Sequence, residues 1–209
     1  ALYRFLIADS IAFNRRATVR WEHGASNESR EPYRAAVLWY GSPVETALAS
    51  DELLPADPVS RAMHGYTSDG AREYHLTSAQ AYALGSPTSS ATGVSHTTGS
   101  SFTLSLHPRN VGAFLRRTFD YGVANQTADV FVDGVFAGTW YNPGSFAGPG
   151  ADGQPHRWRD DEMPLPPTLT AGKSSIRIDI RVVPATGASN GTWTEFAYRL
   201  YSLVPPGCG

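Results

Sequence analysis

The strongest constraint on the fold is a strict two-residue alternation near the C-terminus. In residues 175–182, apolar isoleucine and valine alternate with arginine and aspartate in the run Ser-Ile-Arg-Ile-Asp-Ile-Arg-Val. Successive side chains of a strand point to opposite faces of a sheet, so this pattern predicts a half-buried strand. Further strands are predicted at residues 3–8, 18–23, 35–40, 101–106, 113–121 and 192–203.

A β-hairpin is predicted where Asp133-Gly134 separates two β-rich runs within residues 130–140. Both central residues of a tight type I′ turn need a positive φ, which Asp and Gly tolerate. No segment has the pattern of an amphipathic helix of three turns. The sequence therefore predicts an all-β sandwich of jelly-roll or immunoglobulin-like topology.

The chain shows no sustained linker and no internal repeat, which favours a single jelly-roll-like domain over residues 1–209. Two stretches interrupt the strand pattern. Gly85–Ser101 is rich in Ser, Thr and Gly and fits either a long loop or an excursion at a sheet edge. Tyr141–Gly153 is rich in Gly and Pro and predicts a long surface loop.

Charge excludes several partners. With 17 Lys+Arg against 19 Asp+Glu, the formal net charge is -2, so we expect no nucleic acid and no anionic membrane as partner. No apolar run approaches the roughly 18 residues that a membrane span needs. The single cysteine, Cys208, allows no disulfide within the chain, and the six histidines lack metal-binding spacing. We expect no metal and no cofactor.

Three Asn-X-Ser/Thr sequons, at Asn27, Asn125 and Asn190, favour an N-glycosylated, secreted protein. Chance sequons in a chain rich in Ser and Thr are the alternative.

Carboxylates are the plausible catalytic groups. A glycosidase needs two carboxyl groups on either side of a sugar bond. Glu22, Glu28 and Glu31 cluster in residues 21–31, and Asp9 follows an apolar run. Glu22, Glu31 and Asp9 are therefore catalytic candidates; the alternatives are ion pairing or solvation for the glutamates and turn capping for Asp9.

The acidic run Asp160-Asp161-Glu162 could in principle bind a hard cation. It lacks a ligand spacing punctuated by glycine, and arginines adjoin it. We therefore predict a salt-bridged surface strand there.

Aromatic side chains are the candidate sugar contacts. Trp39 and Tyr40 close one predicted strand and Trp140 closes another. Their flat rings suit stacking on the apolar face of a sugar, whereas the alternative is that they fill the sandwich core.

Short motifs in order along the chain resemble the glycoside hydrolase family 172 proteins, also known as DUF2961. The N-terminal motifs are Tyr3-Arg4-Phe5, Asp9-Ser10-Ile11-Ala12-Phe13, Glu22-His23-Gly24 and Trp39-Tyr40. The later motifs are Leu115-Arg116-Arg117-Thr118-Phe119-Asp120-Tyr121, Asn125-Gln126, Val130-Phe131-Val132-Asp133-Gly134, Ala137-Gly138-Thr139-Trp140 and Asp160-Asp161-Glu162. Ser10 departs from the family, which usually has proline there.

The resemblance implies a jelly roll related to double-jelly-roll assemblies, a tendency to oligomerise, and activity on furanosides. The family's catalytic glutamates lie upstream of the Tyr-Arg-Phe motif, so it assigns no catalytic residue here. We therefore expect this chain to be the C-terminal part of a longer precursor, or a subunit with an N-terminal companion that carries the acids.

The leading expectation is a secreted carbohydrate-active module that supplies walls of a furanoside site and assembly contacts. Fold analogy alone does not establish catalysis. One alternative is a self-assembling structural jelly roll. Another is a glycan-binding module, which would show an aromatic platform without paired carboxylates.

Overall fold

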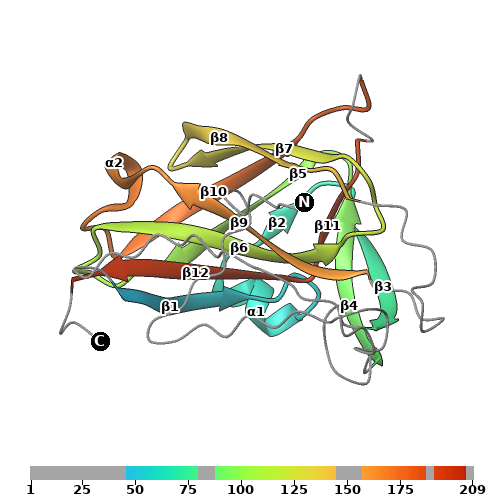
Figure 1. The fold of residues 1–209 in the computed structure, drawn as a ribbon, viewed down its shortest axis with the longest axis horizontal. Helices are drawn as coiled ribbons and strands as arrows, with labels where there is room; N and C mark the ends of the chain where they lie inside the picture. Colours follow the sequence, from blue (N-terminus) through green and yellow to red (C-terminus); the bar gives the residue numbers. More distant parts are fainter. Residues whose placement is uncertain (1–45, 80–87, 145–156, 187–190, 206–209) are drawn as a thin grey trace, which may run out of the picture.

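The computed structural model describes residues 46–79, 88–144, 157–186 and 191–205 (Figure 1). The predicted strands at residues 3–8, 18–23 and 35–40 lie outside these residues. Among the described residues, no helix is both long and apolar enough to cross a membrane.

Two antiparallel sheets form the sandwich (Figure 1). The first sheet has the order β1-β12-β6-β9, with β1 at Thr46–Leu53, β6 at Gly112–Asp120, β9 at Trp158–Leu165 and β12 at Ala197–Val204. The second has the order β2-β5-β10-β7-β8, with β2 at Thr67–Ser68, β5 at Gly99–Ser105, β7 at Gln126–Val132, β8 at Val135–Asn142 and β10 at Ser175–Val182.

The chain alternates between the two sheets. It passes from β5 to β6, from β6 to β7, from β9 to β10, and finally to β12. This jelly-roll arrangement confirms the predicted fold class. The inward side chains of both sheets form one hydrophobic core, which includes Leu104, Leu115, Val130, Ile178 and Leu200.

A third small sheet, ordered β11-β4-β3, lies at one end of the sandwich. Its strands are β3 (Arg72–Ala79), β4 (Thr88–His96) and β11 (Trp193–Glu195). Most of the stretch Gly85–Ser101 is therefore strand and not a long loop, and its main strand β4 lies in the middle of the third sheet, not at an edge. Cross-strand hydroxyl pairs such as Thr77 with Ser90, at 2.7 Å, suit this Ser/Thr-rich hairpin.

The two helices are short: α1 spans Pro58–Met63 and α2 spans Pro167–Thr170. The carboxylate of Asp57 caps α1 by accepting from the amides of Val59 and Ser60.

The clearest sequence predictions are confirmed. Ile176, Ile178, Ile180 and Val182 are buried, while the intervening side chains of β10 face outward. Asp133 and Gly134 have φ of 50° and 81°, as a type I′ hairpin requires.

Two boundaries differ from the prediction. The single strand expected over residues 192–203 breaks at Phe196, because β11 pairs with β4 and β12 pairs with β6. The stretch Tyr141–Gly153 begins as strand, since β8 continues to Asn142; residues 145–156 lie outside the described residues.

Candidate functional site

Most of the predicted site residues lie outside the described part of the chain. These are the catalytic candidates Asp9, Glu22 and Glu31, their neighbour Glu28, the aromatics Trp39 and Tyr40, and the sequon residues Asn27 and Asn190. Their roles stay predictions.

Trp140 is in the described part, and its predicted sugar contact is wrong. The residue is 4% exposed and packs edge-on against Trp193, with ring centroids 5.8 Å apart. The guanidinium of Arg117 lies 5.2 Å from its ring centroid. Because core side chains cover the ring, Trp140 belongs to the core, which was the alternative for the aromatic residues.

The acidic run on β9 binds arginines, as predicted. Asp161 and Glu162 pair with Arg117 and Arg116 on the neighbouring strand β6, and Asp160 accepts from the hydroxyl of Thr118. The predicted surface position is wrong for Asp161 and Glu162, which are buried. No group of His, Cys, Asp and Glu among the described residues could hold a metal ion.

Arg117 lies inside the sandwich. Its guanidinium donates to both carboxylate oxygens of Asp161, at 3.1 and 2.8 Å, and lies 3.4 Å from the ring centroid of Trp193. It also donates to the side chain of Gln126 at 3.2 Å. A bidentate pair with this many partners fixes the register of β6 against β9, so its role is structural.

Glu195 is the centre of a second buried polar cluster. Its carboxylate accepts from the hydroxyls of Tyr66, Ser100 and Tyr198, at 2.7, 2.7 and 2.9 Å, and lies 2.9 Å from Nε2 of His96. Burial raises the pKa of Glu195, but His96 and the hydroxyl donors more than offset this, so the pKa is lowered. Burial beside this carboxylate raises the pKa of Tyr66 and of Tyr198.

A third ionic group lies where β6 ends. Asp120 is buried and binds the guanidinium of Arg157 and the hydroxyl of Tyr74, the latter at 2.6 Å. Burial and this hydrogen bond raise the pKa of Tyr74 to about 12.

The geometry of these clusters argues against catalysis by their four buried carboxylates. The buried carboxylates Asp120, Asp161, Glu162 and Glu195 each have an arginine or histidine partner. A glycosidase needs two carboxyl groups facing a sugar across an accessible site. These four buried carboxylates are therefore partners in structural ion pairs.

The outer face of β7 and β8 offers a different kind of site, which we term the aromatic face: Thr127, Asp129, Phe131, Phe136, Thr139, Tyr141 and Arg181. Opposite residues of an antiparallel pair share a face. Tyr141 is opposite Thr127, Thr139 is opposite Asp129 and Phe136 is opposite Phe131, while the inward residues of β7 are buried.

A bulge brings the aromatic residues together on this face. Phe136 and Tyr141 are five positions apart, an odd spacing that in a regular strand would place them on opposite sides. The pairing of β8 with β7 shifts in register between Val130 and Phe131 of β7. On β8 the shift lies next to Gly138, whose φ is 147°. The extra residue turns both rings outward, where Phe136 is 54% and Tyr141 50% exposed.

Polar contacts hold the aromatic face in place. Phe131 and Phe136 pack edge to face at 5.6 Å, and the guanidinium of Arg181 lies 3.9 Å from the Phe131 centroid. The Tyr141 hydroxyl donates to Oδ1 of Asn125, the sequon residue, at 3.0 Å. The face therefore combines exposed rings with hydrogen-bonding groups at fixed positions.

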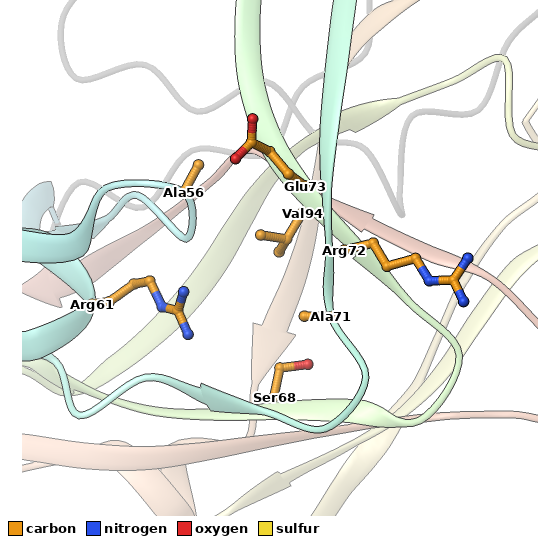
Figure 2. A pocket seen from close by; sticks show the side chains of 7 residues that line it. All are labelled: Ala56, Arg61, Ser68, Ala71, Arg72, Glu73 and Val94. Atoms are coloured by element: carbon orange, nitrogen blue, oxygen red, sulfur yellow. The ribbon is translucent and has the colours of Figure 1, made fainter.

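A pocket of about 240 Å³ lies beside β2, the edge strand of the second sheet opposite β8. It lies between α1 and strands β3 and β4 (Figure 2). It is lined by Ala56, Arg61, Ser68, Ala71, Arg72, Glu73 and Val94. Glu73 is its one carboxylate among the described residues, so the pocket lacks a carboxylate pair.

Comparison with known proteins gives the following. No family model matches the chain, and no curated protein matches it. Among solved structures, a family 35 carbohydrate binding module from Clostridium thermocellum is 12% identical, with 76% of this chain and 98% of that one covered and a TM-score of 0.39.

Two further structures are similar at the same level. The CBM35 from Cellvibrio japonicus Abf62 is 11% identical, covers 78% of this chain and 100% of its own, and has a TM-score of 0.40. The catalytic domain of a GH87 alpha-1,3-glucanase with bound tetrasaccharides is 15% identical, and the match covers 75% of this chain and 28% of that one with a TM-score of 0.41. At such TM-scores the likenesses are too loose to assign a family or a function.

Proposed function

We propose that this chain is a glycan-binding β-sandwich module that holds an oligosaccharide along the aromatic face of β7 and β8. The observation that carries the proposal is the pair of half-exposed rings, Phe136 and Tyr141, on one side of an edge strand. Exposed apolar groups gathered on one surface mark binding sites. Ring faces flanked by polar groups match a sugar, which has apolar C–H faces and hydroxyl edges.

The dimensions favour a ligand longer than one sugar ring. The residues opposite the two rings, Phe131 and Thr127, are four positions apart on β7. At about 3.3 Å per residue the rings are therefore about 13 Å apart. An oligosaccharide lying along β8 would contact both rings, with Thr139 and Asp129 between them.

The proposal favours binding over catalysis, because the buried carboxylates Asp120, Asp161, Glu162 and Glu195 are each occupied in an ion pair. The furanoside preference, the secretion and the role beside a catalytic companion come from the resemblance and the sequons, and they form the finer part of the proposal. A hydrolase that includes the acids Glu22 and Glu31 stays compatible with a binding role for the sandwich.

The test is a binding screen by affinity electrophoresis on soluble polysaccharides, with furanose-rich arabinans and fructans beside pyranose polymers. Retardation by at least one polymer is expected, with furanose polymers preferred. Absence of retardation by all of them would contradict glycan binding. Retardation by pyranose polymers alone would overturn the furanoside preference.

A further inference from the structure

The pocket between α1 and β3 carries charges of both signs. In Figure 2 the guanidinium of Arg61 points toward the pocket from α1, while the carboxylate of Glu73 lies across it on β3 and Arg72 extends away. Among the described residues Arg61 has no carboxylate partner and lies over the Tyr66 ring, 5.2 Å from its centroid. Glu73 binds Nε2 of His75 at 2.7 Å.

The remaining lining is small and largely apolar. Ala56, Ala71 and Val94 present methyl groups, and Ser68 adds a hydroxyl that donates to the carbonyl of Gly99 at 2.7 Å. The volume of about 240 Å³ is below the roughly 300–1,000 Å³ of pockets for drug-sized ligands. The pocket therefore fits one small ring and not a chain.

The buried Glu195 cluster holds the pocket walls rigid. Tyr66, which lies beneath Arg61, donates to Glu195, and Val94 is opposite Glu195 in the β4–β11 ladder. Ser68 is opposite Ser100, whose hydroxyl also donates to Glu195. The carboxylate thus holds Tyr66 and Ser100, which lie next to the lining residues Arg61 and Ser68, and the β4–β11 ladder holds Val94. Walls held in this way reduce the ordering cost of binding.

We propose that this pocket binds a single neutral sugar residue, as a second site distinct from the aromatic face. The guanidinium of Arg61 donates to ring hydroxyls, the carboxylate of Glu73 accepts from them, and the methyl groups contact the C–H face. Glu73 disfavours an anionic ligand and Arg61 a cationic one, so a neutral polyhydroxylated ring is the class that satisfies both. The proposal rests on the proposed carbohydrate function but uses other residues.

The test is a titration of the whole chain with neutral monosaccharides and their methyl glycosides. Binding is monitored by the amide chemical shifts of the chain in NMR spectra. Saturable shifts are expected at the amides of Ser68, Ala71 and Val94. Arg61→Ala and Glu73→Gln are each expected to weaken binding about tenfold, and Arg109→Ala, at an exposed arginine between β5 and β6, is the matched control.

The outcomes separate the two sites. If the pocket amides do not shift with any neutral sugar up to its solubility, or if Arg61→Ala binds like the parent chain, the pocket proposal is overturned. Stronger binding of a uronate than of the neutral sugar would overturn the assigned ligand class. Polysaccharide retardation that survives Arg61→Ala leaves the aromatic face standing, and pocket shifts that survive Phe136→Ala and Tyr141→Ala leave the pocket standing.

Discussion

Arg117 and Asp161 are directly opposite each other on β6 and β9, and both guanidinium-to-carboxylate hydrogen bonds of the pair lie inside the hydrophobic core. When either partner of this ion pair is removed, the charge of the other partner stays buried without a counter-charge. The pair thus specifies which residues of the two strands face each other.

We expect Arg117→Met or Asp161→Asn to lower the free energy of unfolding by about 3–5 kcal/mol, because each leaves the other partner without its counterpart. The double variant Arg117→Met/Asp161→Asn is expected to cost less than the sum of the two single variants. Urea unfolding followed by far-UV circular dichroism measures this. A loss below about 1 kcal/mol in both single variants would contradict a structural role for the pair.

The stability is expected to fall in acid because of Glu195. Its folded-state pKa is lower than the unfolded value of about 4.3. Its contribution is therefore fully present above that value and is lost as the pH falls through the folded pKa. Glu195→Gln is expected to flatten the dependence of the free energy of unfolding on pH below about 4.3.

The matched control for that measurement is Glu52→Gln, at the surface pair with Arg199. It is expected to change the acid dependence much less than Glu195→Gln does. A Glu195→Gln variant whose stability falls with acid as steeply as in the parent chain would argue against the assigned state of this carboxylate.

Gly134 provides a clean test of the hairpin. Its φ is 81°, and a Cβ added there would meet no atom within 4 Å. Gly134→Ala is thus expected to destabilise through backbone conformation alone, by about 1–2 kcal/mol. Thermal unfolding measures this, and an unchanged melting temperature would contradict the type I′ turn.

The sequon at Asn125 adjoins the aromatic face, since Asn125 binds the Tyr141 hydroxyl. Expression in a host that adds N-glycans is expected to place a glycan there and to weaken polysaccharide binding by covering Tyr141. Mass before and after N-glycosidase, together with Asn125→Gln, checks both parts. Equal polysaccharide binding by the glycosylated and deglycosylated chains would show that the glycan does not cover the face.

Local patterns predict several strands of the sandwich but miss β1 and β2. Alternation identifies β10, and Asp133-Gly134 identifies the hairpin, because each signal lies within a few residues. Alternation along β6 also contains a signal for the buried arginine. Arg117 shares a face of that strand with Leu115 and Phe119, both of which are fully buried.

The candidate sites depend on information that local patterns lack. Tyr66, His96 and Ser100 reach Glu195 from segments far away in sequence, 129 residues away for Tyr66. Whether Trp140 or Tyr141 faces the core depends on the register of β8, and a shift of one residue exchanges the two faces. The bulge beside Gly138, and with it the shared face of Phe136 and Tyr141, is set by pairing with β7.

The most direct test of the central claim is the affinity of Phe136→Ala/Tyr141→Ala for the polysaccharide that the parent chain binds best. Isothermal titration calorimetry measures the affinities of the parent chain, of this double variant and of a control variant, Val59→Ala. Val59 is an exposed apolar residue on α1. The account predicts at least a tenfold weaker association for the double variant and an unchanged value for Val59→Ala. An affinity of the double variant equal to that of the parent chain, with its fold intact, would contradict glycan binding at the aromatic face.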